Sequence, residues 1–138
     1  MTSDLEELII PDGIKFTNFN GFARYDGNLV KIGFLKEDGT EGENGIDLSA
    51  VTDTTNCFLS CNKLQEIRFV PDSITKTISF AQSSELSVKS IESIINGLSP
   101  NVSGQTLTLP SKFEVGAEEL YNNRLLEDET LDWTLTFP

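Results

Sequence analysis

The sequence predicts a β-rich α+β fold, in which a stack of short strands is covered on one side by one or two helices. Three observations support this prediction. Short apolar strands with a related spacing recur along the chain. Strand and helix signals are both clear between residues 64 and 110. The 138 residues suffice for one hydrophobic core, so we expect a single domain spanning residues 1–138.

The recurring strands share the apolar spacing L-x-x-[LI]-x-[IF], which occurs at residues 5–10, at 29–34 and, within a strand expected at 64–70, at 64–69. A Pro-Asp turn follows the first and the third copy, as expected where a strand ends. Alternation of apolar and polar side chains is the signal for the other strands. These are expected at residues 46–49, 74–80, 106–110 and 133–137. Each repeat would thus contribute one short strand and one return segment.

The clearest helix is predicted over residues 88–97. Ser87 can cap its N-terminus by accepting a hydrogen bond, and Gly97 marks its end just before a Ser-Pro pair. The apolar residues fall on one face, and they are Ile91, Ile94, Ile95 and Leu98. This face must pack on something, and the neighbouring strands are the obvious partner.

These elements divide the chain into four segments. Residues 1–35 form an N-terminal repeat and cap, and residues 36–45, with the sequence KEDGTEGENG, form an exposed acidic loop. Residues 46–110 contain the central repeats and the predicted helix. Residues 111–138 contain the closing strand and a second helix, which is expected near residues 117–125.

The charge of the chain argues against nucleic acid and membranes as partners. Ten Lys and Arg residues against 22 Asp and Glu residues give a net charge of −12, and there is no His. An acidic surface repels the phosphate groups of nucleic acid and of anionic lipid. Without His, a Ser-His-Asp triad, a Cys-His pair and a His-ligated zinc site are excluded within this chain. The N-terminus also lacks the basic and apolar regions of a signal peptide.

Two groups of residues contain possible metal ligands, but we expect neither group to bind a metal ion. Cys57 and Cys61 are too few for a zinc site and have the wrong spacing for a redox pair, so we expect two reduced, buried thiols. The acidic loop and its flank offer oxygen ligands for calcium but lack the EF-hand spacing. These ligands would be Glu37, Asp38, Glu41, Glu43 and Asp47. We expect a solvated loop here and no cofactor.

An enzyme is not indicated either. A chain with 22 acidic residues offers pairs of carboxylates in any fold, so such pairs give little support for a glycoside hydrolase. Aromatic residues near the N-terminus are better candidates for function. They are Phe16, Phe19, Phe22 and Tyr25. If exposed, they would anchor a partner; if buried, they would plug the open end of the repeat stack. Both interpretations stay open, because a neighbouring subunit covering this end would satisfy both.

A longer motif connects the central strands to a known family. Phe58, Cys61, Leu64 and Ile67 are spaced as F-x-x-C-x-x-L-x-x-I, and an imperfect copy contains Phe22, Leu29 and Ile32. This spacing resembles the degenerate leucine-rich repeats of the BspA type. Residues 86–98 follow the pattern L-S-x-x-S-[LI]-x-x-I-[IL]-N-x-L, and G-x-T-L-T-L and W-T-L follow at 104–109 and 133–135. This order is similar to the closing segment of repeat proteins that occur among bacteriophage structural proteins and bacterial surface proteins.

The resemblance implies a short leucine-rich-repeat-like stack that acts by contact rather than by catalysis. A short, acidic chain with few repeats fits a bacteriophage virion component better than a bacterial surface protein. We therefore expect an accessory protein of the tail, baseplate, fibre or capsid surface, made in the host cytoplasm and located in the virion. Its partners would be other virion proteins or further copies of itself. The alternative is a cell-surface or glycan-binding adhesion module.

Overall fold

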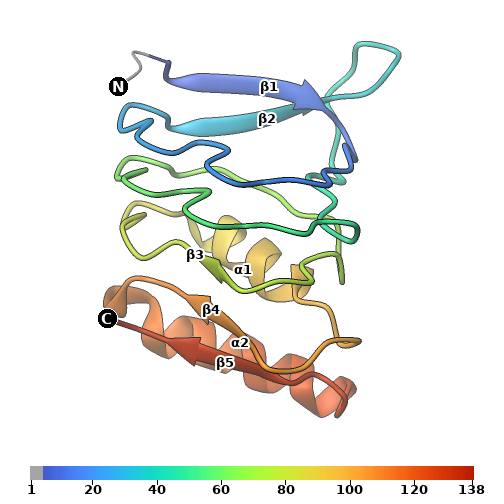
Figure 1. Ribbon diagram of the computed structural model, residues 1–138, viewed down its shortest axis with the longest axis vertical. Coiled ribbons are helices and arrows are strands. Elements are labelled where there is room, and N and C mark those ends of the chain that lie inside the picture. Colours follow the sequence, from blue (N-terminus) through green and yellow to red (C-terminus); the bar gives the residue numbers. More distant parts are fainter. Residues whose placement is uncertain (1–4) are drawn as a thin grey trace.

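The computed structural model describes residues 5–138, which form a small α+β domain with five short strands and two α-helices (Figure 1). In chain order the elements are β1 (Glu7–Pro11), β2 (Lys31–Leu35), β3 (Ile78–Ser79), α1 (Val88–Gly97), β4 (Gln105–Thr108), the 3-10 helix η1 (Ser111–Phe113), α2 (Glu114–Glu127) and β5 (Trp133–Thr136).

All the strand pairs are parallel. β1 pairs with β2 in the register Glu7↔Lys31 to Pro11↔Leu35, and β4 lies between β3 and β5 in a second sheet. Parallel neighbours require the chain to cross over between one strand and the next. Figure 1 shows the resulting course, with successive turns of the chain placed one below another along the long axis from β1 to β5.

The segment that begins each turn of the chain is extended in the first turns and helical in a later one. The Glu6 carbonyl accepts a hydrogen bond from the Val30 amide (2.8 Å), and the Val30 carbonyl accepts one from the Gln65 amide (2.8 Å). The Gln65 carbonyl in turn accepts from the Ser87 amide (2.9 Å), which directly precedes α1. Therefore α1 occupies the place that β1, β2 and the extended segment 65–69 occupy in the preceding turns.

A helix cannot continue a strand ladder, and serine side chains on α1 supply the hydrogen-bond partners that a neighbouring strand would otherwise provide. Its backbone groups are used within the helix, so the amides of segment 65–69 need other acceptors. The Ser90 hydroxyl accepts from the Ile67 amide (3.0 Å) and donates to the Gln65 carbonyl (2.8 Å). The Ser93 hydroxyl accepts from the Phe69 amide (2.9 Å). Residues three apart share one helix face, which places both hydroxyls against the extended segment.

We expect Ser90→Ala to lower the free energy of unfolding by about 1–3 kcal/mol, because it leaves the Ile67 amide buried without an acceptor. Chemical denaturation of the two proteins measures this difference. The control is Ser103→Ala, since Ser103 is exposed and its loss is expected to change stability by less than about 0.5 kcal/mol. Equal stabilities of the two variants would contradict the bridging role of Ser90.

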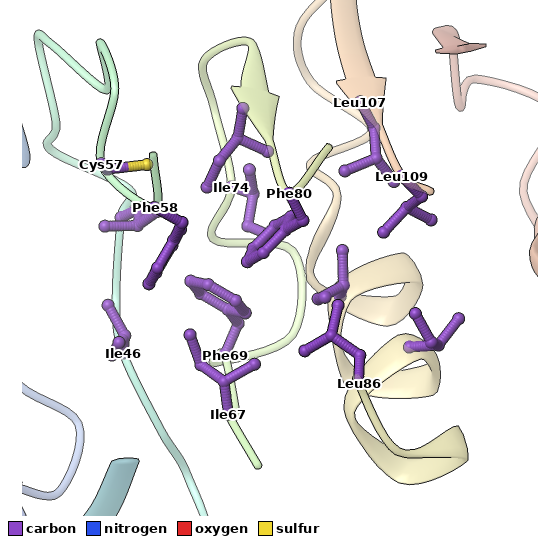
Figure 2. Close-up of a cluster of buried hydrophobic side chains, with 14 of the residues drawn as sticks. Ile46, Cys57, Phe58, Ile67, Phe69, Ile74, Phe80, Leu86, Leu107 and Leu109 are labelled. Carbon is purple, nitrogen blue, oxygen red and sulfur yellow. The ribbon is translucent and has the colours of Figure 1, made fainter. Parts of the chain in front are cut away.

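The core is one continuous cluster in which phenylalanine rings connect successive turns. Phe58 stacks on Phe80 with ring centroids 4.8 Å apart, and Phe80 meets Phe69 edge to face at 6.1 Å. Figure 2 shows these three side chains pointing toward one another between neighbouring turns. On the other side, Phe58 meets Phe19 at 5.7 Å, so the ring series reaches the first turn.

The predicted elements are confirmed in part. The helix at 88–97 has the predicted bounds, and Ser87 caps it by accepting from the Ser90 amide. The helix expected near 117–125 is longer and begins at Glu114. The strand expected at 74–80 is reduced to β3, because the Thr77 amide donates to the side-chain oxygen of Gln105 (2.7 Å) instead of a backbone carbonyl. The strands expected at 46–49 and 64–70 are present only as isolated bridges.

Candidate interaction surface

The aromatic residues of the first turn lie mostly in the core. Phe19 is 1% exposed, Phe16 and Phe22 are half-buried, and Tyr25 is the most exposed of the four at 37%. The Phe19 and Phe22 rings stack at 4.4 Å, and Phe16 meets Phe19 edge to face at 4.9 Å. This corrects the expectation that Phe19 could anchor a partner: its ring is used to link the first turn to Phe58.

Tyr25 is held in a fixed position at the surface. Its backbone has a φ of 65°, and its amide donates to the Leu59 carbonyl (2.7 Å). The Arg24 guanidinium lies 4.5 Å from the centre of the Tyr25 ring and donates to its hydroxyl (3.1 Å). A cation over a ring face is favourable. The pair therefore presents an ordered aromatic and cationic surface beside the first turn.

A second exposed surface lies on β1 and β2 and was missed by sequence reasoning. Ile9 is 53% exposed and Leu35 is 43% exposed, whereas the neighbouring Leu8 and Ile10 are half-buried. The signal was present in the sequence, because three consecutive apolar residues in a strand must place one of them on the outer face. Single exposed apolar residues are common, but these two lie beside the same cavity.

The cavity at this end of the sheet has a volume of about 590 Å³. Apolar side chains from both strands line it together with residues of the acidic loop 36–45. The lining residues are Ile9, Ile10, Pro11, Asp12, Leu35, Lys36, Glu37 and Asn44. A concave site with apolar walls and a few charged groups is the usual form of a binding site.

The acidic loop is fastened to the end of β1 by Asp12. One carboxylate oxygen of Asp12 accepts from the Asn44 amide (3.0 Å) and from the Gly45 amide (2.9 Å). Gly42 is required for this contact, because a Cβ there would overlap the Asp12 side chain. The loop is otherwise exposed, as its composition predicted. Its place beside β1 brings its residues into the lining of the cavity.

Of the five acidic residues considered as calcium ligands, Asp38 and Asp47 have separate partners. Asp38 accepts hydrogen bonds from the Thr40 hydroxyl and amide, which lower the pKa of its carboxyl group. Asp47 lies 3.9 Å from the Lys15 ammonium group and accepts from the Ser49 amide. Among residues 5–138 no three acidic or cysteine side chains gather in an arrangement that could hold a metal ion.

Both cysteines are buried and reduced, as predicted. Burial raises the pKa of Cys57 to about 12 and that of Cys61 to about 11. The Cys61 thiol donates to the Ala23 carbonyl (2.9 Å). High thiol pKa values leave little of the reactive thiolate at neutral pH, so these cysteines act as packing residues.

The fold and the surface thus define a small α+β protein with an exposed apolar surface at its first turn. Comparison with family models, curated proteins and solved structures finds no significant match for this chain. Within the described part of the chain, neither helix has the length and apolar character needed to cross a membrane.

Proposed function

We propose that this chain is a non-catalytic interaction protein whose contact surface is the end of the stack formed by β1. The observation that carries the proposal is the incomplete burial of this end. Leu8 and Ile10 point inward from β1 yet are only half-buried, and Ile9 is exposed on the outer face. In repeat proteins an uncovered terminal turn exposes apolar surface, which a cap or a partner must bury.

We further propose that the stack is a leucine-rich-repeat-like one of the BspA type. The motif residues Phe58, Cys61, Leu64 and Ile67 support this proposal, since each is at most 4% exposed. In such repeats the recurring apolar positions fill the interior of each turn. In the imperfect copy, Leu29 and Ile32 are equally buried and Phe22 is packed against the same core.

The proposed setting is a bacteriophage particle, in which the chain serves as an accessory component of the tail, baseplate, fibre or capsid surface. A net charge of −12 keeps the chain away from packaged nucleic acid and favours contact with other proteins. The test is mass spectrometry of particles purified on a density gradient. We expect peptides of this chain in the particle fraction at a constant ratio to the major virion proteins. Recovery in the particle-free fraction alone would refute this setting.

The second candidate function is a glycan-binding adhesion module, and the exposed Arg24–Tyr25 pair favours it. Aromatic faces and hydrogen-bonding groups are suited to sugar rings. A glycan array decides the matter, with Tyr25→Ala as the variant that should lose binding. A chain that binds no glycan, or that binds equally well without Tyr25, argues against this function and leaves the structural one in place.

A further inference from the structure

The free edge of β1 exposes backbone groups that are able to pair with another strand. Alternate residues of a strand direct their backbone groups to opposite sides. The Glu6 carbonyl accepts from the Lys31 amide (3.1 Å), and the Asp12 amide donates to the Leu35 carbonyl (2.9 Å), so the even-numbered residues face β2. Glu7 and Ile9 therefore face away from β2. Within residues 5–138, β1 has no strand partner other than β2.

At the opposite end of the stack, a side chain of α2 protects the edge strand β5. The Leu109 amide donates to the Thr136 carbonyl (3.1 Å), so Trp133 in β5 faces away from β4. The Tyr121 hydroxyl accepts from the Trp133 amide (2.9 Å) and lies 3.2 Å from the Trp133 carbonyl, to which it donates. A side chain of α2 thus occupies backbone groups that could pair with another strand. Proteins commonly protect their strand edges in such ways.

The side chains around β1 set the chemistry of an added strand. Residues of that strand that point inward would lie beside Leu8 and Ile10, which are half-buried and need apolar neighbours. Residues that point outward would lie beside Glu7 and Ile9, which are exposed. An added strand therefore needs apolar side chains on its inner face. Strand side chains alternate between faces, so the outer residues can be charged.

The charged side chains around β1 favour basic residues at the outward-pointing positions of an added strand. Four carboxylates flank the free edge and the cavity, from Glu6, Glu7, Asp12 and Glu37, and the cations beside them are Lys31 and Lys36. The whole chain adds to this imbalance with its net charge of −12. A basic segment is attracted to such a surface and an acidic one is repelled.

The same features disfavour a second copy of this chain as the occupant. An antiparallel pair of β1 strands centred on Ile9 would place Glu7 opposite Pro11 of the other copy. Proline has no amide proton, so the outward carbonyl of Glu7 would stay unpaired. The pair would also bring Glu6 opposite Asp12, and like charges across a strand pair are destabilising.

We propose that the free edge of β1 binds an extended segment of a partner protein as an additional β-strand, and that this segment alternates apolar and basic residues. This inference rests on the proposed interaction function and names the chemistry of the partner. Binding of this kind takes its affinity from backbone hydrogen bonds and its specificity from alternate side chains.

The test uses three peptides of about eight residues, the length of an ordinary strand. One alternates Val and Lys, the second has the same composition with all Val residues before all Lys residues, and the third alternates Val and Glu. We expect the alternating Val-Lys peptide to bind the full chain at least about tenfold more tightly than either control in isothermal titration calorimetry. In NMR hydrogen exchange it should slow exchange of the Ile9 amide and not that of the Leu135 amide.

Two variants separate the strand edge from general charge attraction. Ile9→Pro removes the outward amide proton without touching the β2 ladder, and proline is tolerated on an edge strand. We expect it to weaken binding of the Val-Lys peptide about tenfold, while the matched control Ile9→Val retains the wild-type affinity within about twofold. Glu7→Lys should weaken binding of the Val-Lys peptide and strengthen that of the Val-Glu peptide. Thermal melts of each variant exclude loss of folding.

Several results would overturn the proposal: no binding of any peptide, equal binding of the alternating and block peptides, or wild-type affinity of Ile9→Pro. Failure of the broader function is recognised separately in the particle fraction. If wild-type chain and Ile9→Pro both remain in purified particles, the interaction function stands and the strand-edge mechanism fails. If the wild-type chain is missing from particles, the virion setting fails whatever the peptides do.

Discussion

Replacement of Phe58 by alanine is expected to lower the free energy of unfolding by about 3–5 kcal/mol, the range for large core aromatics. Phe58 is 2% exposed and joins rings from three turns, since it stacks on Phe80 at 4.8 Å and meets Phe19 at 5.7 Å. Its loss leaves a cavity and removes these ring contacts. Urea denaturation followed by far-UV circular dichroism measures the change, and the melting temperature should fall by on the order of 10 °C.

Two further variants make the Phe58 result specific. Phe58→Leu keeps most of the volume and should cost less than Phe58→Ala, by about 2 kcal/mol or more. Leu126→Ala removes an apolar side chain that is 83% exposed on α2, so it should change stability by no more than about 0.5 kcal/mol. Should Phe58→Ala cost no more than Leu126→Ala, the ring series would not be what holds the turns together.

Gly45→Ala is also expected to lower the free energy of unfolding by about 3–5 kcal/mol, because of the backbone conformation and the backbone contacts at this position. Gly45 has a φ of +96°, and a Cβ there would overlap the Arg68 carbonyl oxygen and lie 2.8 Å from the Phe69 nitrogen. These atoms cannot move freely, because the Ile46 amide donates to that same carbonyl (2.9 Å). The substitution would therefore force apart two neighbouring turns. Thermal and urea denaturation measure the loss.

Gly39 provides the matched control for Gly45. It also has a positive φ, of +84°, but has open space where its Cβ would lie. Gly39→Ala therefore carries the cost of the left-handed backbone alone, about 1–2 kcal/mol. The difference between the two variants measures the contact between turns. If both lose the same stability, backbone strain accounts for the whole effect and the close approach to Arg68 contributes nothing.

The sequence predicts α1 well because its signals are local. Ser87, the apolar face and Gly97 all lie within one short segment, and the helix has the predicted bounds. The segment at 64–70 shows the opposite case. Its apolar spacing matches that of β1 and β2, but its Ile67 and Phe69 amides donate to serine hydroxyls of α1, because the neighbour that follows is a helix. Strand formation depends on residues distant in sequence, which the pattern of one segment does not report.

The sequence pointed to aromatic residues near the N-terminus and not to the exposed surface of β1 and β2. Composition marked Phe16, Phe19, Phe22 and Tyr25, but only the folded chain shows that the three phenylalanine rings pack with one another and that Tyr25 lies outside. Exposure of Ile9 depends on which face of β1 meets the core and on the absence of a further turn within residues 5–138. Neither is a local property of the sequence.

The change from strands to helices along the stack gives the molecule two ends that do not match. A stack of parallel strands with equal ends would be able to join head to tail and grow into an open-ended fibre. Here β1 would have to meet α2, whose backbone hydrogen bonds are used within the helix. The serine bridges that join segment 65–69 to α1 are therefore also the point at which this row of strands ends. We therefore expect no head-to-tail growth of copies through this row, whereas the free edge of β1 can take a single additional strand.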